Sequence, residues 1–368
     1  MNKQPTTIGF IGLGLIGGSI AKAIRHFYPG IRLIAASGHS ETIRQALLEG
    51  LIDEGCTAAT DAAFHNCDYI FLCAPVSLNA DYLKILKPVI KKDCIITDVG
   101  STKTDIHKKV TELGMEENFI GGHPMAGSEK TGLHNAKRHL IENAYYIITP
   151  TEKVSKDALN DYTEFIASLK ALPLVLDYRE HDYITAAISH LPHLIAAGLV
   201  NLVKQNDTKA ESMKTMAAGG FKDITRIASS SPLMWEQICM TNHENISMLL
   251  EKYIESMKKI KDSLDLQRRE DIYRLFEESS EYRNSFSDHP AGPIKKAYAL
   301  YVDLLDETGG IATVATILAC NQINLKNIGI VHNREFEEAV LKIEFYEEEP
   351  CKKAASLLRR HRYTVYER

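Results

Sequence analysis

The sequence lacks the cysteine patterns of a zinc site or a disulfide framework. It has seven cysteines, which is an odd number, and no two of them have the C-x-x-C spacing. Most of them lie in apolar segments that are typical of strands or helices, where a cysteine behaves as a small reduced core residue. We therefore expect no metal, no disulfide and a cytoplasmic protein.

An excess of positive charge is also lacking, as is any long apolar run. The 43 Lys and Arg residues and 48 Asp and Glu residues give a formal net charge of -5, and no dense basic tract alternates with aromatic residues. This composition gives no reason to expect nucleic acid as a partner. The apolar runs have the length of a strand and the N-terminus has no signal-peptide pattern, so we expect no membrane partner.

Short apolar runs alternate with helical patterns through the first half of the chain. The candidate strands are residues 8–11, 33–36, 69–73, 95–97, 119–120, 145–148 and 172–176. Such alternation predicts an α/β fold with a doubly wound, parallel Rossmann-type sheet and helices on both faces.

Strand signals stop near Asp182, and a long helical pattern replaces them, which predicts an all-α domain. Residues 288–293 have the composition of a linker. The remainder has a βαββαβ pattern with a turn at Asn333-Arg334. We expect a dinucleotide-binding domain at 1–178, a helical substrate and dimerisation domain at 179–288 and a small regulatory domain at 298–368.

A glycine-rich turn joins the first candidate strand to a helical pattern. It reads Gly12-Leu13-Gly14-Leu15-Ile16-Gly17-Gly18. In such a turn the first glycine makes the bend, the second lets the backbone approach a pyrophosphate, and the third allows close packing of helix on strand. The anion then lies at the helix N-terminus, so the turn predicts dinucleotide binding.

The acidic residue that would bind the ribose 2′-hydroxyl of NAD is missing. About twenty residues after the motif, where it is expected, the sequence has Ser37-Gly38-His39-Ser40. His39 and Arg44 could bind a 2′-phosphate, but no arginine follows the strand directly. The sequence favours NAD over NADP and makes Ser37 a candidate cofactor contact.

Two further strand ends are candidate parts of the cofactor crevice. Ala74-Pro75 ends one strand, and Thr97-Asp98-Val99-Gly100-Ser101-Thr102-Lys103 ends the next. Open α/β sheets bind ligands at the carboxyl ends of their strands. Ser101 could therefore bond a substrate hydroxyl or the nicotinamide, although it could equally cap the helix expected from Thr104.

An imidazole lies within Gly121-Gly122-His123-Pro124-Met125-Ala126-Gly127-Ser128-Glu129. The glycines allow unusual dihedral angles or close ligand approach, and Pro124 biases His123 toward extended geometry. We interpret the segment as a shaped loop, neither helix nor strand, that aims His123 into a site. A tight turn with a solvated histidine is the alternative.

The helical part carries two more polar groups. Ser189-His190-Leu191-Pro192-His193 sets two imidazoles three residues apart beside a proline that must kink or interrupt the helix. Without an acidic third ligand this pair is a poor metal site, and a substrate contact is the better interpretation. Lys222 and Arg226 lie at i, i+4, which suits either a surface helix or a face that binds carboxylates.

Taken together, these segments resemble the prephenate/arogenate dehydrogenase family of tyrosine biosynthesis. The resemblance runs in order from about residue 8 to 295, with one departure, since many NAD-using relatives have Asp where this chain has Ser37. It implies oxidative decarboxylation of a cyclohexadienol, in which hydride goes from the hydroxyl-bearing carbon to the nicotinamide while carbon dioxide leaves and the ring becomes aromatic. It also implies a homodimer.

The resemblance assigns roles to individual residues. His123 would be the catalytic base, with a pKa near the ordinary 6.5 or so. Ser101 would orient the substrate hydroxyl and the nicotinamide, and Arg226 would bind the carboxylate. Four further residues would contact substrate or the pocket entrance, the last of them from the partner subunit: His193, Lys222, Glu129 and Trp235.

The C-terminal module resembles an ACT domain, a small-molecule sensor that often pairs across dimers. Its candidate effector contacts are the helix start Gly309-Gly310-Ile311 and the segment Asn324-Leu325, which offer backbone N–H groups and an amide to a free amino acid. Because the resembled pathway ends in tyrosine, we expect tyrosine to bind there and inhibit. A purely structural role in dimerisation is the alternative.

Three other functions stay open on the sequence alone. Arogenate, which has an amino side chain in place of the keto side chain of prephenate, would undergo the same chemistry. A non-catalytic NAD or amino-acid sensor would need no base aimed at the nicotinamide, so His123 argues against it. A β-hydroxyacid dehydrogenase would resemble its relatives in having a catalytic Lys in the helical domain, whereas the base here is a histidine.

Overall fold

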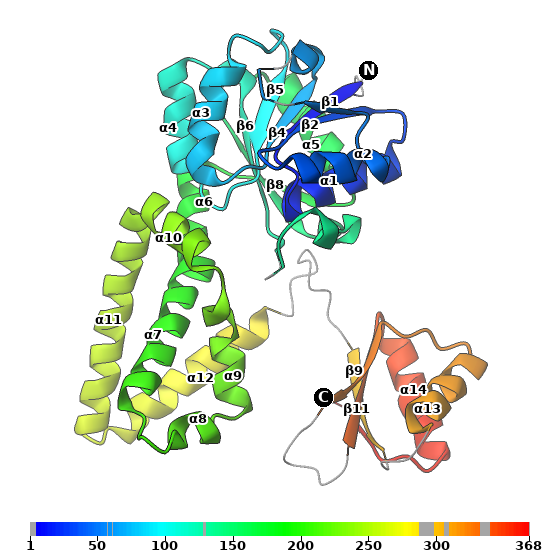
Figure 1. Ribbon diagram of the computed structural model, residues 1–368. Helices are drawn as coiled ribbons and strands as arrows, with labels where there is room; N and C mark the ends of the chain where they lie inside the picture. The colour runs from blue at the N-terminus through cyan, green and yellow to red at the C-terminus, as the bar shows by residue number, and fades with distance from the viewer. Residues whose placement is uncertain are drawn as a thin grey trace. The chain divides into compact units, whose positions relative to one another are not determined.

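The computed structural model describes residues 5–56, 58–60, 62–127, 130–286, 298–304, 309–331 and 339–367. The chain divides into two compact units, Met1–Asp262 and Ser263–Arg368 (Figure 1). The expected linker at 288–293 and the expected turn at Asn333-Arg334 lie outside the described residues.

A five-stranded parallel sheet forms the centre of the first unit. Its strands, in spatial order, are β3 (Glu54–Cys56), β2 (Arg32–Ala36), β1 (Thr7–Ile11), β4 (Tyr69–Leu72) and β5 (Ile95–Asp98). Ile8 pairs with Leu33 on one side and with Tyr69 on the other. The chain therefore moves outward in one direction from β1 to β3 and in the other from β4 to β5, which makes the β1–β4 boundary the switch point where such sheets bind ligands.

A second sheet continues beyond β5. It has the order β6 (Ile120–Pro124), β7 (Tyr145–Pro150) and β8 (Leu172–Val175), and a parallel bridge from Ile96 to Phe119 joins it to β5. The pair β6–β7 is antiparallel and β7–β8 is parallel. The expectation of a parallel arrangement thus holds for the first five strands and is wrong for β6 against β7.

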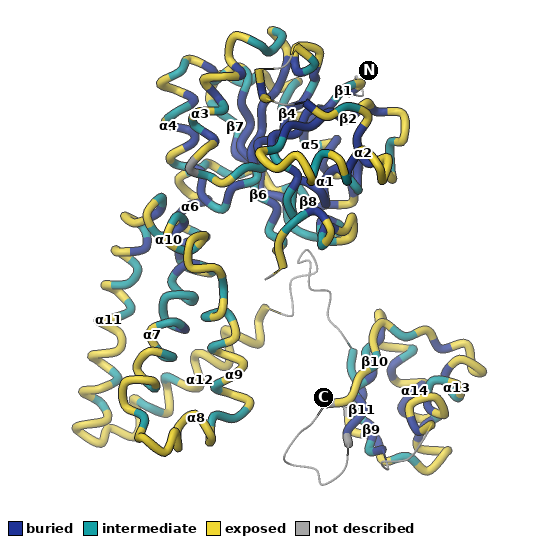
Figure 2. Tube along the Cα trace, viewed as in Figure 1, coloured by how far each residue is buried: buried dark blue, intermediate teal, exposed yellow. Residues whose placement is uncertain are grey.

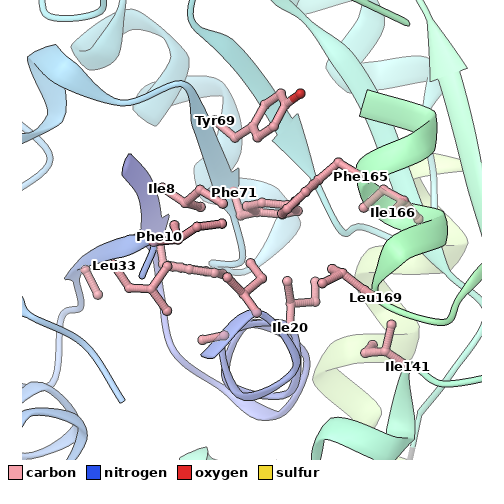
Figure 3. Packing of buried hydrophobic residues seen from close by; sticks show 14 of the residues in the cluster. Ile8, Phe10, Ile20, Leu33, Tyr69, Phe71, Ile141, Phe165, Ile166 and Leu169 are labelled. Carbon is pink, nitrogen blue, oxygen red and sulfur yellow. The ribbon is translucent and has the colours of Figure 1, made fainter. Parts of the chain in front are cut away.

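Helices cover both faces of the parallel sheet, as the sequence predicts. They are α1 (Leu15–Phe27), α2 (Ser40–Leu48), α3 (Val76–Leu86), α4 (Thr104–Leu113) and α5 (Lys156–Ser168). Neighbouring residues of one strand enter different cores: Phe10 packs with Phe71, whereas Ile11 packs with the cluster on the opposite face. Figure 3 shows the first cluster, closed by Phe165 of α5. Strands buried on both faces explain why the sequence shows continuous apolar runs here.

The helical part begins with one long helix built from three stacked segments. They are α6 (Tyr178–Thr185), the π-helical turn η5 (Ala186–His190) and α7 (Leu191–Asn206). The π turn ends two residues before Pro192, which has no N–H to donate and so interrupts the regular ladder as expected. The following helices are α8 (Ser212–Met216), α9 (Gly219–Thr225), α10 (Pro232–Thr241), α11 (His243–Asp265) and α12 (Arg269–Ser285), with the 3-10 turn η6 (Arg226–Ser229) after α9.

The expectation that apolar runs are only strand-sized is wrong for Tyr178–Asn206. Because the three segments stack end to end, they form a helix of 29 residues that is long and apolar enough to cross a membrane, judged by length and composition alone. Only 17% of its most apolar window is buried within the chain. Figure 2 shows how little of the helical part is buried compared with the strands of the Rossmann-type sheet.

The C-terminal unit contains a four-stranded antiparallel sheet with two helices. Its order is β10 (Asn327–Val331), β11 (Ala339–Phe345), β9 (Tyr298–Leu304) and β12 (Val365–Glu367), and its helices are α13 (Gly310–Cys320) and α14 (Glu348–Arg360). Leu300, Val302 and Leu341 pack with Val314 and Leu358 in its core. The βαββαβ order expected from the sequence is confirmed. All seven cysteines of the chain are free.

Two adjacent glycines let β6 approach β5 closely. A Cβ on Gly122 would lie 2.6 Å from the backbone oxygen of Asp98 and 2.8 Å from the hydroxyl of Tyr146. A Cβ on Gly121 would lie 2.2 Å from Oγ1 of Thr149. The glycines thus serve close packing of strand on strand, and the residue that follows them, His123, is placed by that packing.

We expect Gly122→Ala to destabilise the protein, because the added methyl meets backbone and cannot be accommodated by a rotamer change. Overpacking of this kind costs about 1–3 kcal/mol. Gly30→Ala is the matched control, since a Cβ there meets nothing within 4 Å, and its effect should stay within about 0.5 kcal/mol. Urea unfolding of both variants measures the difference, and equal stability would contradict this account of β6.

Candidate active site

The glycine-rich turn forms an open cradle at the switch point. Gly12 has φ +95°, and a Cβ there would lie 2.9 Å from the backbone oxygen of Cys73. Gly17 lies so close to the turn that a Cβ would meet the oxygen of Gly12 at 2.6 Å, whereas a Cβ on Gly14 would meet nothing within 4 Å. The first glycine therefore makes the bend, the second leaves room for a ligand, and the third allows close packing. The free N–H groups of the first turn of α1 face the open side.

The other candidate cofactor contacts surround the same edge. Ser37 follows β2, and its hydroxyl accepts a hydrogen bond from the backbone N–H of His39 at 3.3 Å. Ala74 and Pro75 follow β4, and Pro75 precedes the first residue of α3. These positions are the carboxyl ends of parallel strands, where a dinucleotide lies in sheets of this type.

The segment after β5 is fixed by two buried carboxylates. Asp98 accepts hydrogen bonds from the backbone N–H groups of Gly100 and Gly122 and pairs with the ammonium of Lys103, and neither charged side chain is more than 1% exposed. Asp182, from α6, accepts the backbone N–H groups of Lys103 at 2.8 Å and Thr104 at 2.7 Å. Asp182 therefore caps α4.

This arrangement overturns the capping alternative for Ser101. The first N–H groups of α4 bond to Asp182, and the side chain of the N-cap residue, Lys103, makes no capping bond. Within the described part of the chain, the hydroxyl of Ser101 has no hydrogen-bond partner, and the residue is partly exposed. Its hydroxyl is therefore available to a ligand at the strand ends.

His123 lies in a strand, which corrects the expectation of a loop. β6 includes both His123 and Pro124, and His123 is paired with Ile147 of β7. Because the bridge from Ile96 to Phe119 is parallel, the carboxyl ends of β5 and β6 share an edge, and His123 lies near that end of β6. The strand, rather than a special turn, therefore aims the imidazole.

A chain of hydrogen bonds leads from His123 into the protein. Nδ1 of His123 lies 2.8 Å from Nε2 of His181, and Nδ1 of His181 lies 2.8 Å from Oδ1 of Asp182. His181 is 1% exposed and Asp182 is fully buried, whereas His123 keeps part of its surface exposed. A carboxylate can only accept hydrogen bonds. Asp182 therefore fixes the hydrogen positions along this series of hydrogen bonds.

The pKa of His123 is well below the ordinary value of 6.5, which corrects the expectation of an unperturbed base. Burial is the first cause, and the nearby His181, Lys103 and His190 add to it because each disfavours a second positive charge. Burial alone would raise the pKa of Asp182, but hydrogen bonds from His181 and Thr104 outweigh it, and this pKa is lowered. His123 is consequently a neutral imidazole at neutral pH.

His190, the first imidazole of the pair in the helical part, is packed inside. It is 2% exposed, and its Nδ1 lies 3.2 Å from the side-chain nitrogen of Asn242. The same nitrogen donates to the backbone oxygen of Asp182 at 2.7 Å, which settles the orientation of the amide. Burial lowers the pKa of His190 to about 4.

His193, the second imidazole, faces a group of aromatic and cationic residues. Its ring stacks on Trp235 with centroids 3.7 Å apart, and its Nδ1 lies 2.8 Å from the backbone oxygen of Ser189. Its pKa is lowered by burial and by the nearby charge of Arg226. Trp235 also lies 6.0 Å from the ring of His190. Trp235 thus packs on two imidazoles of its own chain, and its expected contribution to the site of the partner subunit stays a prediction.

The predicted cationic pair spans a helix boundary. Lys222 lies in α9, and Arg226 begins the 3-10 turn η6; both are exposed. Glu129, the expected entrance residue, lies outside the described residues. Among the described residues, no group of three or more His, Cys, Asp and Glu side chains is placed to hold a metal ion.

Two family models cover most of the chain. The nucleotide-binding domain of prephenate dehydrogenase matches residues 20–174, and the dimerization domain of prephenate dehydrogenase matches residues 177–278. The chain belongs to the prephenate dehydrogenase family. Its activity is accordingly that of an NAD-dependent oxidoreductase of tyrosine biosynthesis.

Full-length relatives support the same assignment. The chain is 37% identical over 356 residues to a prephenate dehydrogenase of Bacillus subtilis, with 96% of each chain covered. It is 34% identical over 355 residues to a prephenate dehydrogenase of Lactococcus lactis, with 95% of this chain and 96% of the relative covered. The similarity therefore extends beyond residue 278, where the second family model ends.

Solved structures match about three quarters of the chain. Prephenate dehydrogenase from Aquifex aeolicus, in complex with hydroxyphenyl propionate and NAD+, has a TM-score of 0.73 at 29% identity and covers 78% of this chain and 100% of its own. Synechocystis arogenate dehydrogenase has a TM-score of 0.69 at 29% identity and covers 76% of this chain and 99% of its own. NAD, which the sequence favours, is thereby confirmed as the cofactor.

Sequence reasoning missed three buried residues that organise the family's site in this chain. His181, Asp182 and Asn242 connect His123, His190 and α4 through hydrogen bonds. No signal marked the first two, because they directly follow Arg179 and Glu180 in the polar first turns of α6. Asn242 had no signal either, since Asn is common at helix ends.

We predict that this family member loses stability as the pH falls below about 6.5. His107, which stacks on Tyr178 at 4.3 Å, and His190 each have a folded-state pKa of about 4, mainly because of burial, so the unfolded chain takes up protons that the folded chain cannot. Each site should cost about 2 kcal/mol at pH 5 relative to pH 7.5.

His107→Gln removes one of these titrating groups without creating a charge. The fall in melting temperature between pH 7.5 and pH 5 should therefore be smaller in this variant than in the wild-type protein. Thermal unfolding at both pH values measures the two slopes, and identical slopes would show that His107 titrates normally in the fold.

Proposed function

We propose that the chain oxidises prephenate with NAD and releases carbon dioxide, giving 4-hydroxyphenylpyruvate. The observation that carries the proposal is the neutral, partly exposed imidazole of His123 at the shared carboxyl edge of β5 and β6. An imidazole held in this form can accept the proton of a substrate hydroxyl at its remaining nitrogen, Nε2.

The glycine cradle fits a dinucleotide, since Gly14 leaves open the space beside the first turn of α1. Gly12, Leu13, Gly14, Leu15, Ile16 and Gly17 would hold the pyrophosphate, with Ser37, Ala74 and Pro75 along the same strand ends. Bound NAD supplies the hydride acceptor. The protein's own task at this point is to orient the substrate, and the hydroxyl of Ser101 would accept or donate the orienting hydrogen bond.

The substrate's carboxylates would lie toward the second group of residues. Arg226 suits a carboxylate because its planar guanidinium can donate two parallel hydrogen bonds, and Lys222 adds a further positive charge. Nδ1 of His193 donates to the backbone oxygen of Ser189, so Nε2 is its free nitrogen, and Trp235 offers an aromatic face beside it. Glu129 as an entrance residue stays a prediction.

Prephenate is the favoured substrate, and arogenate is the second candidate. The two full-length relatives from Bacillus subtilis and Lactococcus lactis carry the name prephenate dehydrogenase, whereas the Synechocystis neighbour is an arogenate dehydrogenase and matches a smaller part of the chain. The two substrates differ only in the side chain, which carries either a keto or an amino group.

The decisive measurement is the formation of reduced nicotinamide with each substrate and cofactor. Wild-type protein should turn over prephenate with NAD, and His123→Asn should lower kcat by about a hundredfold or more, the usual contribution of a positioned base. His65→Asn is the control, because His65 is an exposed histidine bonded to the backbone of Val89. Turnover of arogenate but not of prephenate would make arogenate the substrate. A normal kcat in His123→Asn would remove His123 from the mechanism.

The apolar surface of the long helix supports a homodimer. The window of Tyr178–Asn206 that is most apolar is mostly unburied within one chain, and it lies inside the segment that matches a dimerization domain. Exposed apolar area of this kind is stabilised by burial against a second surface. Self-association through this helix accounts for its composition, and the cytoplasmic location stays a prediction.

The C-terminal unit is proposed to be an ACT domain that binds tyrosine and inhibits. Gly309 has φ +92° and precedes α13, whose first turn offers unpaired N–H groups to a carboxylate. Asn324 is exposed, and its side-chain oxygen accepts the backbone N–H of Leu325, which leaves its amide hydrogens available to a ligand. Gly310 and Ile311 complete the proposed effector site.

Asn324→Ala should weaken inhibition by tyrosine without changing kcat in its absence. Asn321→Ala is the matched control, because Asn321 lies on the same segment and its amide donates to the backbone of Ile317. Initial rates with prephenate across a range of tyrosine concentrations give the inhibition constants. Unchanged inhibition in Asn324→Ala would place the effector elsewhere.

A further inference from the structure

The strongest unassigned feature of the molecule is the buried pair His181–Asp182 behind His123. The three side chains form a continuous line of hydrogen bonds, each 2.8 Å long. They come from two parts of the chain, since His123 belongs to β6 and the other two belong to α6. Family membership alone assigns no role to these two residues. Their burial implies one, because a buried carboxylate is costly unless it is hydrogen-bonded.

Hydrogen positions along this line follow from the acceptor at its end. Asp182 also accepts two backbone N–H groups and has a lowered pKa, so it is an ionised acceptor and Nδ1 of His181 must carry a hydrogen. When the ring of His181 carries this one hydrogen, its Nε2 has a lone pair and accepts from Nδ1–H of His123. The second nitrogen of His123, Nε2, is left with a lone pair that can accept a hydrogen bond.

We propose that His181 and Asp182 are positioning residues that hold His123 in the Nδ1–H tautomer and receive its proton during turnover. This inference rests on the proposed function of His123 as the base. When the substrate hydroxyl gives its proton to Nε2 of His123, the Nδ1–H bond of His123 breaks and that proton passes to Nε2 of His181. One proton enters the line and one moves along it, so no further reactant is needed.

The charges around the line explain why the proton moves on. Lys103 and His190 lie near enough to His123 to disfavour a positive charge there, although Asp98 partly offsets Lys103. The other end of the line has the opposite character, because Nδ1 of His181 bonds directly to the carboxylate of Asp182. A proton that passes from His123 to His181 therefore moves toward a carboxylate, which stabilises the positive charge.

The tautomer of His123 distinguishes this proposal from a merely structural role of His181 and Asp182. A merely structural role would leave the tautomer unchanged when His181 is replaced. Nitrogen-15 NMR of histidine-labelled full-length protein at pH 7.5, with His123→Asn for assignment, should show His123 protonated at Nδ1. In His181→Leu, which removes the acceptor, His123 should shift toward the Nε2–H tautomer, because the bond made by one ring nitrogen sets the state of the other. An Nε2–H tautomer in the wild-type protein would overturn the proposal, whether or not His181→Leu folds.

Kinetics separate positioning from proton transfer. His181→Gln keeps an oxygen that accepts from Nδ1–H but cannot take the proton, so kcat should fall by about tenfold with the tautomer retained, whereas His181→Leu should lose about a hundredfold, with KM for prephenate and NAD within about threefold in both. His107→Gln, a buried histidine bonded to Thr149, is the control and should keep kcat. Full kcat in His181→Gln would overturn proton transfer, and full kcat in His181→Leu would overturn the whole proposal.

The NMR measurement needs no substrate, so it judges the relay separately from the reaction. If prephenate is not oxidised while His123 shows the Nδ1–H tautomer, the proposed function fails and the positioning by His181 and Asp182 stands. If prephenate is oxidised while His123 shows the other tautomer, the proposed function stands and the relay fails.

Discussion

The buried carboxylate of Asp182 is the constraint on which the site depends. It accepts the first backbone N–H groups of α4 and the imidazole of His181, and the backbone oxygen of the same residue accepts from Asn242. A fully buried carboxylate is tolerated only when its oxygens are bonded in this way. One residue of the long helix therefore fixes the segment after β5 and the strand that carries His123.

A second buried carboxylate completes this framework from the sheet side. Asp98 bonds the backbone of Gly100 and of Gly122 and pairs with Lys103, so the end of β5 is tied both to the start of α4 and to β6. Because β6 can approach only where Cβ atoms are absent, the two glycines before His123 and the carboxylate of Asp98 act together. His123 and Ser101 are thus held by rigid elements, which is what precise positioning of a reacting group requires.

Local patterns in the sequence were sufficient for the elements and for the cofactor turn. The glycines at 12, 14 and 17 have roles that depend on a strand, a bend and a helix in immediate succession, and the structure has this succession. Apolar periodicity likewise placed the strands of the parallel sheet, apart from β3, which is only three residues long. These features depend on residues within one turn or one strand of each other, and the chain alone therefore determines them.

Contacts between distant residues were decided by the tertiary structure. His123 and His181 are 58 positions apart, and Asp182 and Lys103 are 79 apart, so no local pattern could reveal the hydrogen bonds that orient His123 and cap α4. The stacking of Trp235 on His193 and the antiparallel course of β6 are of the same kind. The sequence by itself determined which side chains could perform the chemistry, whereas burial and partners, which exist only in the folded chain, decided their protonation and their aim.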